Sequence, residues 1–469
     1  MADGRSGLAA ALGLASPATA ERHEGGRLDG VWRMNGYGTV LTIHHGRLTA
    51  YDTTRVGCLP GRTHAGRLGG PERGGATRFG NDGVAWLTVT PEGRGHADLQ
   101  PDGSVSTRHL TRISALPEPC RRPAPDDPLT IFDRFWANFN ENYPFFAAKG
   151  IDWQAVRDRY RPAITPDTSD QQLQQIFTEM LRPLNDAHIA LLYHGDPVFN
   201  GWRPGTLLPC PYLMDRSTPV IAGQLTGPGR EFANGRITVG ELPDKIGYLR
   251  ITSFREYVDN GSYAAEQAEL DRALDALFSQ AGTGMRGLVV DNRLNSGGSD
   301  ALGLRIAARL TDRPYLAYTK VARNDPADPR RFTRPQPITV HPATNARRWT
   351  GPVALLTGGS TVSAGESFTQ ALMGRSPQVT RIGENTQGVF SDVLFRVLAN
   401  DPEKWLVGLP NEEYHDRYGK TYDGTGIPPH LRTPVFTEEE LNRHQDSALT
   451  RARQLLASDS AKAASEHSK

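Results

Sequence analysis

A serine at a strand-to-helix turn is the first feature of this sequence that could do chemistry. Ser363 follows a short apolar run, 352–356, and a glycine-rich turn, 357–361, and it opens a stretch with the composition of a helix. A helix N-terminus presents unpaired N–H groups and a partial positive charge, which stabilise a developing oxyanion. The same residues fit an ordinary capping box, with Ser363 as N-cap and Glu366 as the third helical residue. The serine alone leaves a nucleophile and a helix cap as alternatives.

A glycine pair elsewhere in the chain has a similar setting. Gly297 and Gly298 follow the apolar run 287–291, which we expect to be a buried strand. Active groups in sheets with helical crossovers collect in the loops that follow strand ends. We therefore expect this glycine pair and Ser363 to lie in one site. His188 lies in a turn that enters another predicted strand, where a histidine is usually structural.

The composition restricts the class of protein. The 469 residues include 53 Lys and Arg against 52 Asp and Glu, so nothing suggests a nucleic-acid or polyanion binder. No apolar run approaches the roughly 20 residues that a membrane span needs. Residues 7–15 weakly resemble the core of a signal peptide, but we expect a flexible tail over residues 1–27. The location stays open, with the cytoplasm slightly favoured and secretion as the alternative.

Cysteine and histidine usage gives little sign of a cofactor. Three cysteines do not make a disulfide framework. Cys58 and Cys120 could pair in an oxidising compartment, leaving Cys210 free, or the three thiols could be unrelated. The pair His44 and His45 falls on a predicted hairpin turn, without Cys, Asp or Glu at ligand spacing nearby. We therefore expect neither a metal nor a cofactor.

The first part of the chain is predicted to be an all-β domain over residues 28–118. Gly, Asn and Asp punctuate short strand-like runs at hairpin spacing. These runs are 39–43, 47–51, 84–89 and 105–110. No residues in this domain suggest chemistry, so we expect an accessory or substrate-presenting module.

The rest of the chain is predicted to be helical and then α/β. Apolar stripes of helical period, such as the aromatic residues between 132 and 139, predict a helical domain over residues 127–200. A capping box at Ser169 begins another of these helices. Strands and helices alternate over residues 201–436, which predicts a sheet with helical crossovers. We expect a C-terminal helix and tail over residues 437–469.

Four motifs in order along the chain resemble those of the tail-specific, or C-terminal processing, serine peptidases. The motifs are Ile246–Phe254, Asp291–Gly298, Thr361–Glu366 and Gly383–Gly388. The helical stretch ending at His188 resembles the domain that precedes this core in the tricorn-like branch. The resemblance covers residues 129–435 and implies an α/β core of the crotonase or ClpP kind, a βα spiral. Too few residues lie between His188 and Ile246 for the PDZ domain that many members carry.

The resemblance also implies roles for single residues. Ser363 would be the nucleophile. One branch of the family activates its serine with a lysine, but residues 386–390 contain none. His188 stands where the tricorn-like branch has its histidine base. Asp423 replaces the family's glutamate and would orient His188, although an ordinary Asp-Gly turn residue is the alternative.

Backbone N–H groups would complete the site implied by the resemblance. Those of Gly297 or Gly298, together with that of Ala364, would form the oxyanion hole. The sequence thus predicts a serine peptidase that cleaves a peptide or unfolded protein through an acyl-enzyme. The alternatives are a peptide acyl-transferase or cyclase on the same machinery, and a non-catalytic binding protein on the same core. The family also suggests a homo-oligomer.

Overall fold

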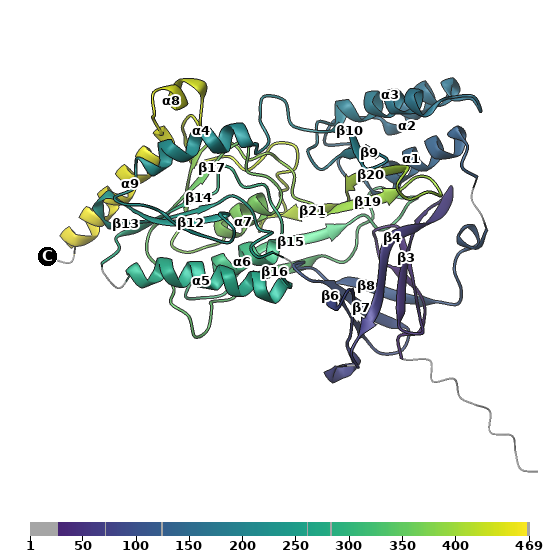
Figure 1. Cartoon of the computed structure of the whole chain (residues 1–469), viewed down its shortest axis with the longest axis horizontal. Coiled ribbons are helices and arrows are strands. Elements are labelled where there is room, and N and C mark those ends of the chain that lie inside the picture. Colours follow the sequence, from purple (N-terminus) through teal and green to yellow (C-terminus); the bar gives the residue numbers. More distant parts are fainter. Residues whose placement is uncertain (1–26, 71, 123–124, 260, 282–283, 467–469) are drawn as a thin grey trace, which may run out of the picture.

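The chain forms a β-barrel, a group of short helices and an α/β core, in that order along the sequence (Figure 1). The computed structural model describes residues 27–70, 72–122, 125–259, 261–281 and 284–466. The tail expected over residues 1–27, apart from its last residue, and the weak signal-peptide resemblance lie outside this part. In the described part, no helix has the length and apolar character needed to cross a bilayer.

The N-terminal domain is a closed antiparallel barrel, because its last strand pairs with its first. Its strands are β1 (Gly30–Met34), β2 (Thr39–His44), β3 (Arg47–Thr54), β4 (Gly57–Leu68), β5 (Thr77–Asn81), β6 (Val84–Pro91), β7 (His96–Pro101) and β8 (Arg108–Ile113). Closure leaves no free sheet edge. The strand predicted at 105–110 was placed too early, and four of the strands, β1, β4, β5 and β7, were not predicted.

A disulfide joins the barrel to the segment that leaves it. Cys58 on β4 bonds to Cys120 in a 3-10 helix, Glu118–Arg121, with the two Cα atoms 4.9 Å apart. Cys210 is free. Of the two alternatives left by the sequence, the structure therefore shows the pair.

The helical region owes its packing to aromatic side chains. Its helices are α1 (Pro128–Asn142), α2 (Trp153–Tyr160) and α3 (Asp170–Leu181). The stripe on α1 packs against α3, where the ring centroids of Phe135 and Phe177 are 4.0 Å apart. The predicted capping box of Ser169 and Gln172 is present at the start of α3. After α3, the left-handed residue Asn185 turns the chain toward His188.

A small sheet connects this helical region to the core. It has the order β10-β9-β20-β19. Its strands are β9 (Ala190–Tyr193), β10 (Asp196–Asn200), β19 (Val393–Val397) and β20 (Trp405–Pro410). Figure 1 shows β19 and β20 between the helices and the barrel. The position of His188, just before β9, is thus fixed by strands some 200 residues later in the chain.

The core is a seven-stranded sheet whose central strands are buried on both faces. Its strands are β11 (Arg230–Phe232), β12 (Ile237–Leu242), β13 (Ile246–Ile251), β14 (Gly287–Asp291), β17 (Val353–Thr357), β18 (Thr380–Gly383) and β22 (Leu431–Arg432). Within this sheet, the neighbouring strands β13, β14, β17, β18 and β22 run parallel to one another. The alternation of strands and helices predicted from the sequence is present.

Helices cover both faces of this sheet. One layer contains α5 (Tyr263–Ala281), α6 (Asp300–Ala308) and α7 (Ala364–Met373), and the other contains α4 (Pro211–Ala222), α8 (Glu438–Asn442) and α9 (Ser447–Glu466). A further sheet lies beside the first layer, made of β15 (Tyr315–Ala322), β16 (Gln336–Val340) and β21 (Glu412–His415). The residues between His188 and Ile246 all belong to these sheets and helices or their connections, and none forms a separate PDZ unit in the described structure.

The disulfide yields a testable prediction about stability. Replacing Cys58 and Cys120 by serine should lower the free energy of unfolding by about 2–4 kcal/mol, because a long loop is no longer closed in the unfolded chain. The measurement is urea unfolding followed by circular dichroism, with Cys210→Ser as the control. Equal urea midpoints for the double variant and the control would show that the bond contributes nothing.

Candidate active site

Ser363 sits on a sharp turn between β17 and α7 with an unusual backbone conformation. Its φ is 56° and its ψ is −122°, whereas an ordinary N-cap residue has extended angles. Such angles are strained for a side chain with a Cβ and are typical of functional sites. A strand-to-helix turn of this kind exposes a nucleophilic serine at the top of a sheet. The predicted capping box of Ser363 and Glu366 is present, but a capping box alone does not account for the backbone angles of Ser363.

Glu366 holds the turn in place. Its carboxylate accepts hydrogen bonds from the N–H groups of Ser363 (3.3 Å), Gly388 (2.6 Å) and Val389 (2.8 Å). The Ser363 N–H also donates to the Val389 carbonyl oxygen at 3.0 Å. Burial raises the pKa of Glu366 to about 8, against the hydrogen bonds that it accepts. This glutamate braces the site and is fully buried, so it does not contact substrate.

Gly297 packs directly against Ser363, and Gly298 packs against the backbone of Phe254. A Cβ on Gly297 would lie 2.6 Å from that of Ser363, and one on Gly298 would collide with a backbone carbonyl. Both glycines also have positive φ values, 85° and 129°. Only glycine fits this approach.

The backbone donors around Ser363 differ in what they already bind. The Gly297 N–H donates to Asn295 Oδ1 at 2.8 Å. In the described part of the chain, the N–H groups of Gly298 and Ala364 have no hydrogen-bond acceptor. These two donors, rather than that of Gly297, are free to bind an oxyanion.

His188 reaches the site from the turn before β9. Its backbone N–H donates to Asp186 Oδ1 at 3.0 Å, and Asp186 in turn accepts the hydroxyl of Tyr143 at 2.8 Å. Only 9% of His188 is exposed, and its Nδ1 has no partner among the described residues. Burial lowers the pKa of His188, partly opposed by the carboxylates of Asp186 and Asp392. The imidazole is therefore biased toward the neutral form that a general base needs.

One cavity of about 610 Å³ brings half of the predicted site residues together. Ser363, His188 and Gly298 all line it. Three further lining residues, Arg108, Asp392 and Phe395, were not singled out from the sequence. The predicted nucleophile, the predicted base and a predicted oxyanion donor thus line the same cavity.

Asp423 does not line this cavity. Its carboxylate accepts the N–H of Phe390 at 3.2 Å and the hydroxyl of Thr421 at 2.7 Å. No hydrogen bond between Asp423 and His188 is found in the described structure. Burial raises the pKa of Asp423 well above its ordinary value, and the Thr421 hydrogen bond only partly offsets this. A carboxyl group biased toward its neutral form is a weak stabiliser of an imidazolium ion.

The pKa of Asp392 is shifted in the opposite direction to that of Asp423. Burial alone would raise its pKa, but Lys320 and Arg108 outweigh burial and hold the pKa below its ordinary value. Arg108 Nη2 lies 3.6 Å from the carboxylate and Lys320 Nζ 3.7 Å. Asp392 is therefore an ionised carboxylate in the cavity of Ser363 and His188. No local sequence pattern marks it, because its cationic partners come from distant strands.

The described part of the chain has no group of three or more His, Cys, Asp or Glu side chains placed to bind a metal ion. The candidate site consists of one serine, one histidine, nearby carboxylates and backbone donors. Such a set carries out nucleophilic acyl chemistry.

Two family models match this chain. The model of peptidase family S41 matches residues 245–433, which contain Ser363 and the glycine pair. The model of the tricorn protease C1 domain matches residues 125–182, the helical region. The core of this chain is therefore similar to peptidase family S41. The second match adds the tricorn-like character, so the resemblance stated from the motifs is confirmed and the protein is a serine peptidase.

Solved structures support the same fold. A candidate peptidase from Parabacteroides merdae ATCC 43184 is 26% identical, with a TM-score of 0.60, over 71% of this chain and 97% of that one. Mature CPAF in complex with lactacystin is 14% identical, with a TM-score of 0.51, over 71% of this chain and 97% of that chain. No curated protein matches the sequence.

The buried position of His188 predicts the pH dependence of this peptidase. A general base must be neutral, so kcat/KM should fall as the pH drops through the His188 pKa. Because burial lowers that pKa, the acidic limb should lie below the ordinary histidine value of about 6.5. Rates on one peptide between pH 4 and 9 test this. An acidic limb with its midpoint well above about pH 6.5 would contradict the conclusion that burial lowers the pKa of His188.

Proposed function

We propose that this peptidase hydrolyses peptide bonds through an acyl-enzyme formed on Ser363. The supporting observation is that Ser363, held in its strained turn, shares a cavity with the buried His188 and with Gly298. The imidazole accepts the hydroxyl proton as Ser363 Oγ bonds to the substrate carbonyl carbon. The N–H groups of Gly298 and Ala364 donate to the oxyanion that forms.

In the remaining steps His188 acts first as a general acid and then again as a general base. The imidazolium of His188 gives its proton to the leaving amine as the peptide C–N bond breaks, which leaves an ester on Ser363. A water molecule then loses a proton to His188 and attacks the ester carbonyl. The acid product leaves and the proton returns to Ser363, so the enzyme ends each cycle unchanged.

The carboxylate that supports His188 has two candidates. The family resemblance assigns Asp423, with one methylene less than the family's glutamate. Asp392 is favoured by its position in the cavity and by the cations that keep it ionised. We propose that Asp392 stabilises the imidazolium and that Asp423 holds the Phe390 backbone beside the Ser363 turn.

We also propose that the core is a βα spiral of the crotonase or ClpP kind. The parallel order β13-β14-β17-β18, with helices in the connections, supports this assignment. The proposed domains are a barrel over residues 28–118, a helical domain over 127–200 and a core over 201–436, followed by a C-terminal helix.

Replacing the nucleophile tests the proposed mechanism. Ser363→Ala should lower kcat/KM by a factor of about a thousand or more, because no acyl-enzyme can form. Wild type and variant are incubated with unfolded casein and a mixed peptide library, and products are identified by mass spectrometry. Ser360→Ala, a buried serine three residues earlier, is the matched control and should keep activity. Equal cleavage by wild type and Ser363→Ala would refute the assignment. New amide products formed with an added amine would indicate acyl transfer.

A pair of conservative substitutions separates the two carboxylates. Asp392→Asn should lower kcat by about 100-fold to 10,000-fold, because the imidazolium loses its counter-charge. Asp423→Asn should have a much smaller effect, since that carboxyl group is already biased toward its neutral form. Steady-state kinetics on one peptide, with circular dichroism as a check on folding, measure both. A larger loss in Asp423→Asn would return the role to Asp423.

A further inference from the structure

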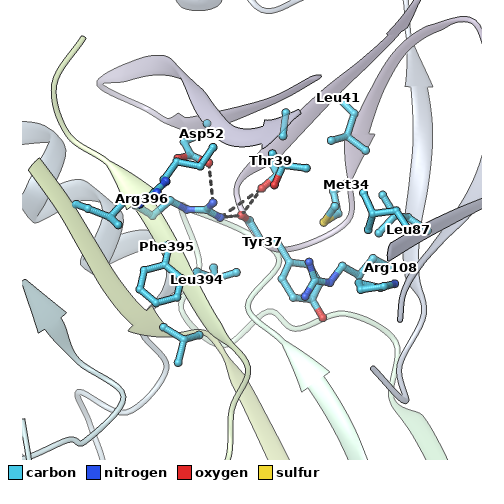
Figure 2. Close-up of a pocket in the computed structure, with 18 of the residues that line it drawn as sticks. Met34, Tyr37, Thr39, Leu41, Asp52, Leu87, Arg108, Leu394, Phe395 and Arg396 are labelled. Carbon is cyan, nitrogen blue, oxygen red and sulfur yellow. Dashed lines mark hydrogen bonds and ion pairs between the residues drawn. The ribbon is translucent and has the colours of Figure 1, made fainter. Parts of the chain in front are cut away.

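A second cavity, of about 510 Å³, lies at the mouth of the N-terminal barrel (Figure 2). Its wall is mostly apolar and comes from both the barrel and the hairpin of β19 and β20. The apolar lining includes Met34, Leu41, Leu87, Leu99, Leu394 and Leu406. The opposite half of the barrel is filled by buried side chains such as Trp32 and Phe79. The cavity is therefore a closed-ended pocket that takes a compact group rather than a long chain.

This barrel pocket adjoins the cavity of Ser363. Arg108, Val393 and Phe395 line both. Phe395 is 51% exposed, although large apolar side chains are usually buried. Figure 2 shows its ring beside Leu394 at the hairpin side of the pocket. A peptide bound at Ser363 can therefore place a neighbouring side chain over Phe395 and into the barrel mouth.

The charged groups of the barrel pocket are already paired. Arg396 lies 2.7 Å from Asp52 and also donates to the Tyr37 carbonyl oxygen (Figure 2). The Arg108 guanidinium stacks over the Tyr37 ring at 4.8 Å and lies 3.6 Å from Asp392. A bound carboxylate would thus meet cations that already have anionic partners. The pocket favours an uncharged group over the free C-terminus of a peptide.

We propose that the barrel mouth is a specificity pocket that binds a large, uncharged apolar side chain of the peptide substrate. The inference rests on the peptidase site proposed above and extends it, since it assigns a role to the N-terminal barrel. The pocket selects internal apolar residues near the scissile bond and does not require a free C-terminal carboxylate.

Matched peptides test this pocket. Each pair carries leucine or serine at one position near the scissile bond, with free or amidated C-termini. Wild type should cleave the leucine peptide at least about tenfold better at one position, since apolar pockets discriminate in this range. Amidation should not remove the preference. Absence of any leucine preference, or loss of the preference on amidation, would overturn the proposal.

Two variants locate the preference in the barrel. Phe395→Ala removes the exposed ring, and Ala50→Leu narrows the pocket from β3. Each should lower the leucine-to-serine ratio of kcat/KM by about tenfold. Tyr418→Ala, which removes an 84% exposed ring elsewhere, is the control and should keep the ratio. An unchanged ratio in both pocket variants would overturn the proposal.

A binding measurement separates this proposal from the catalytic one. Calorimetric titration of Ser363→Ala with the same amidated peptides needs no turnover. Tighter binding of the leucine peptide, weakened by the added Phe395→Ala change, supports the pocket even if wild type cleaves nothing. Equal binding of leucine and serine peptides refutes the pocket even if cleavage is efficient.

Discussion

The strained backbone of Ser363 is the constraint on which the rest of the site depends. A positive φ at a residue with a Cβ costs about 1–3 kcal/mol and persists only where neighbours determine it. Here the neighbours are the buried carboxylate of Glu366, the Val389 carbonyl oxygen and the close approach of Gly297. These contacts join the loop after β14, the start of α7 and the segment before β19. The proposed nucleophile and the free backbone donors are thus positioned by one set of interactions.

The proposed base, His188, comes from a different part of the chain, and tertiary packing fixes its position. β9 pairs with β20, which brings His188 to the edge of the core. The barrel is held to the same region by the Tyr37 hydroxyl, which donates to Glu412 at 2.6 Å. Lys320 lies 3.2 Å from Glu412, and together with Arg108 it keeps Asp392 ionised beside a neutral imidazole. The barrel thereby contributes to the electrostatics of the cavity and to its wall.

Features that depend on local sequence patterns could be predicted from the sequence, whereas features that depend on long-range contacts could not. The aromatic stripe of α1, the Ser169 capping box and the strand–helix alternation are local, and the sequence predicted them. Barrel closure through β1 and β8, and the pairing of β9 with β20, join residues far apart in the chain, so no window of sequence reveals them. Ser363, His188 and Gly298 were chosen from motifs and line one cavity. The roles of Asp423 and Asp392 depend on burial and distant cations, which the sequence does not display.

The most direct test of the account is the site of reaction with a fluorophosphonate. Such a reagent forms a stable adduct with a serine activated by a base, and peptide mapping by mass spectrometry identifies the modified residue. We expect a single adduct on Ser363, formed more slowly as the pH falls through the His188 pKa. A folded protein that forms no adduct, or forms it on another serine, would contradict the central claim.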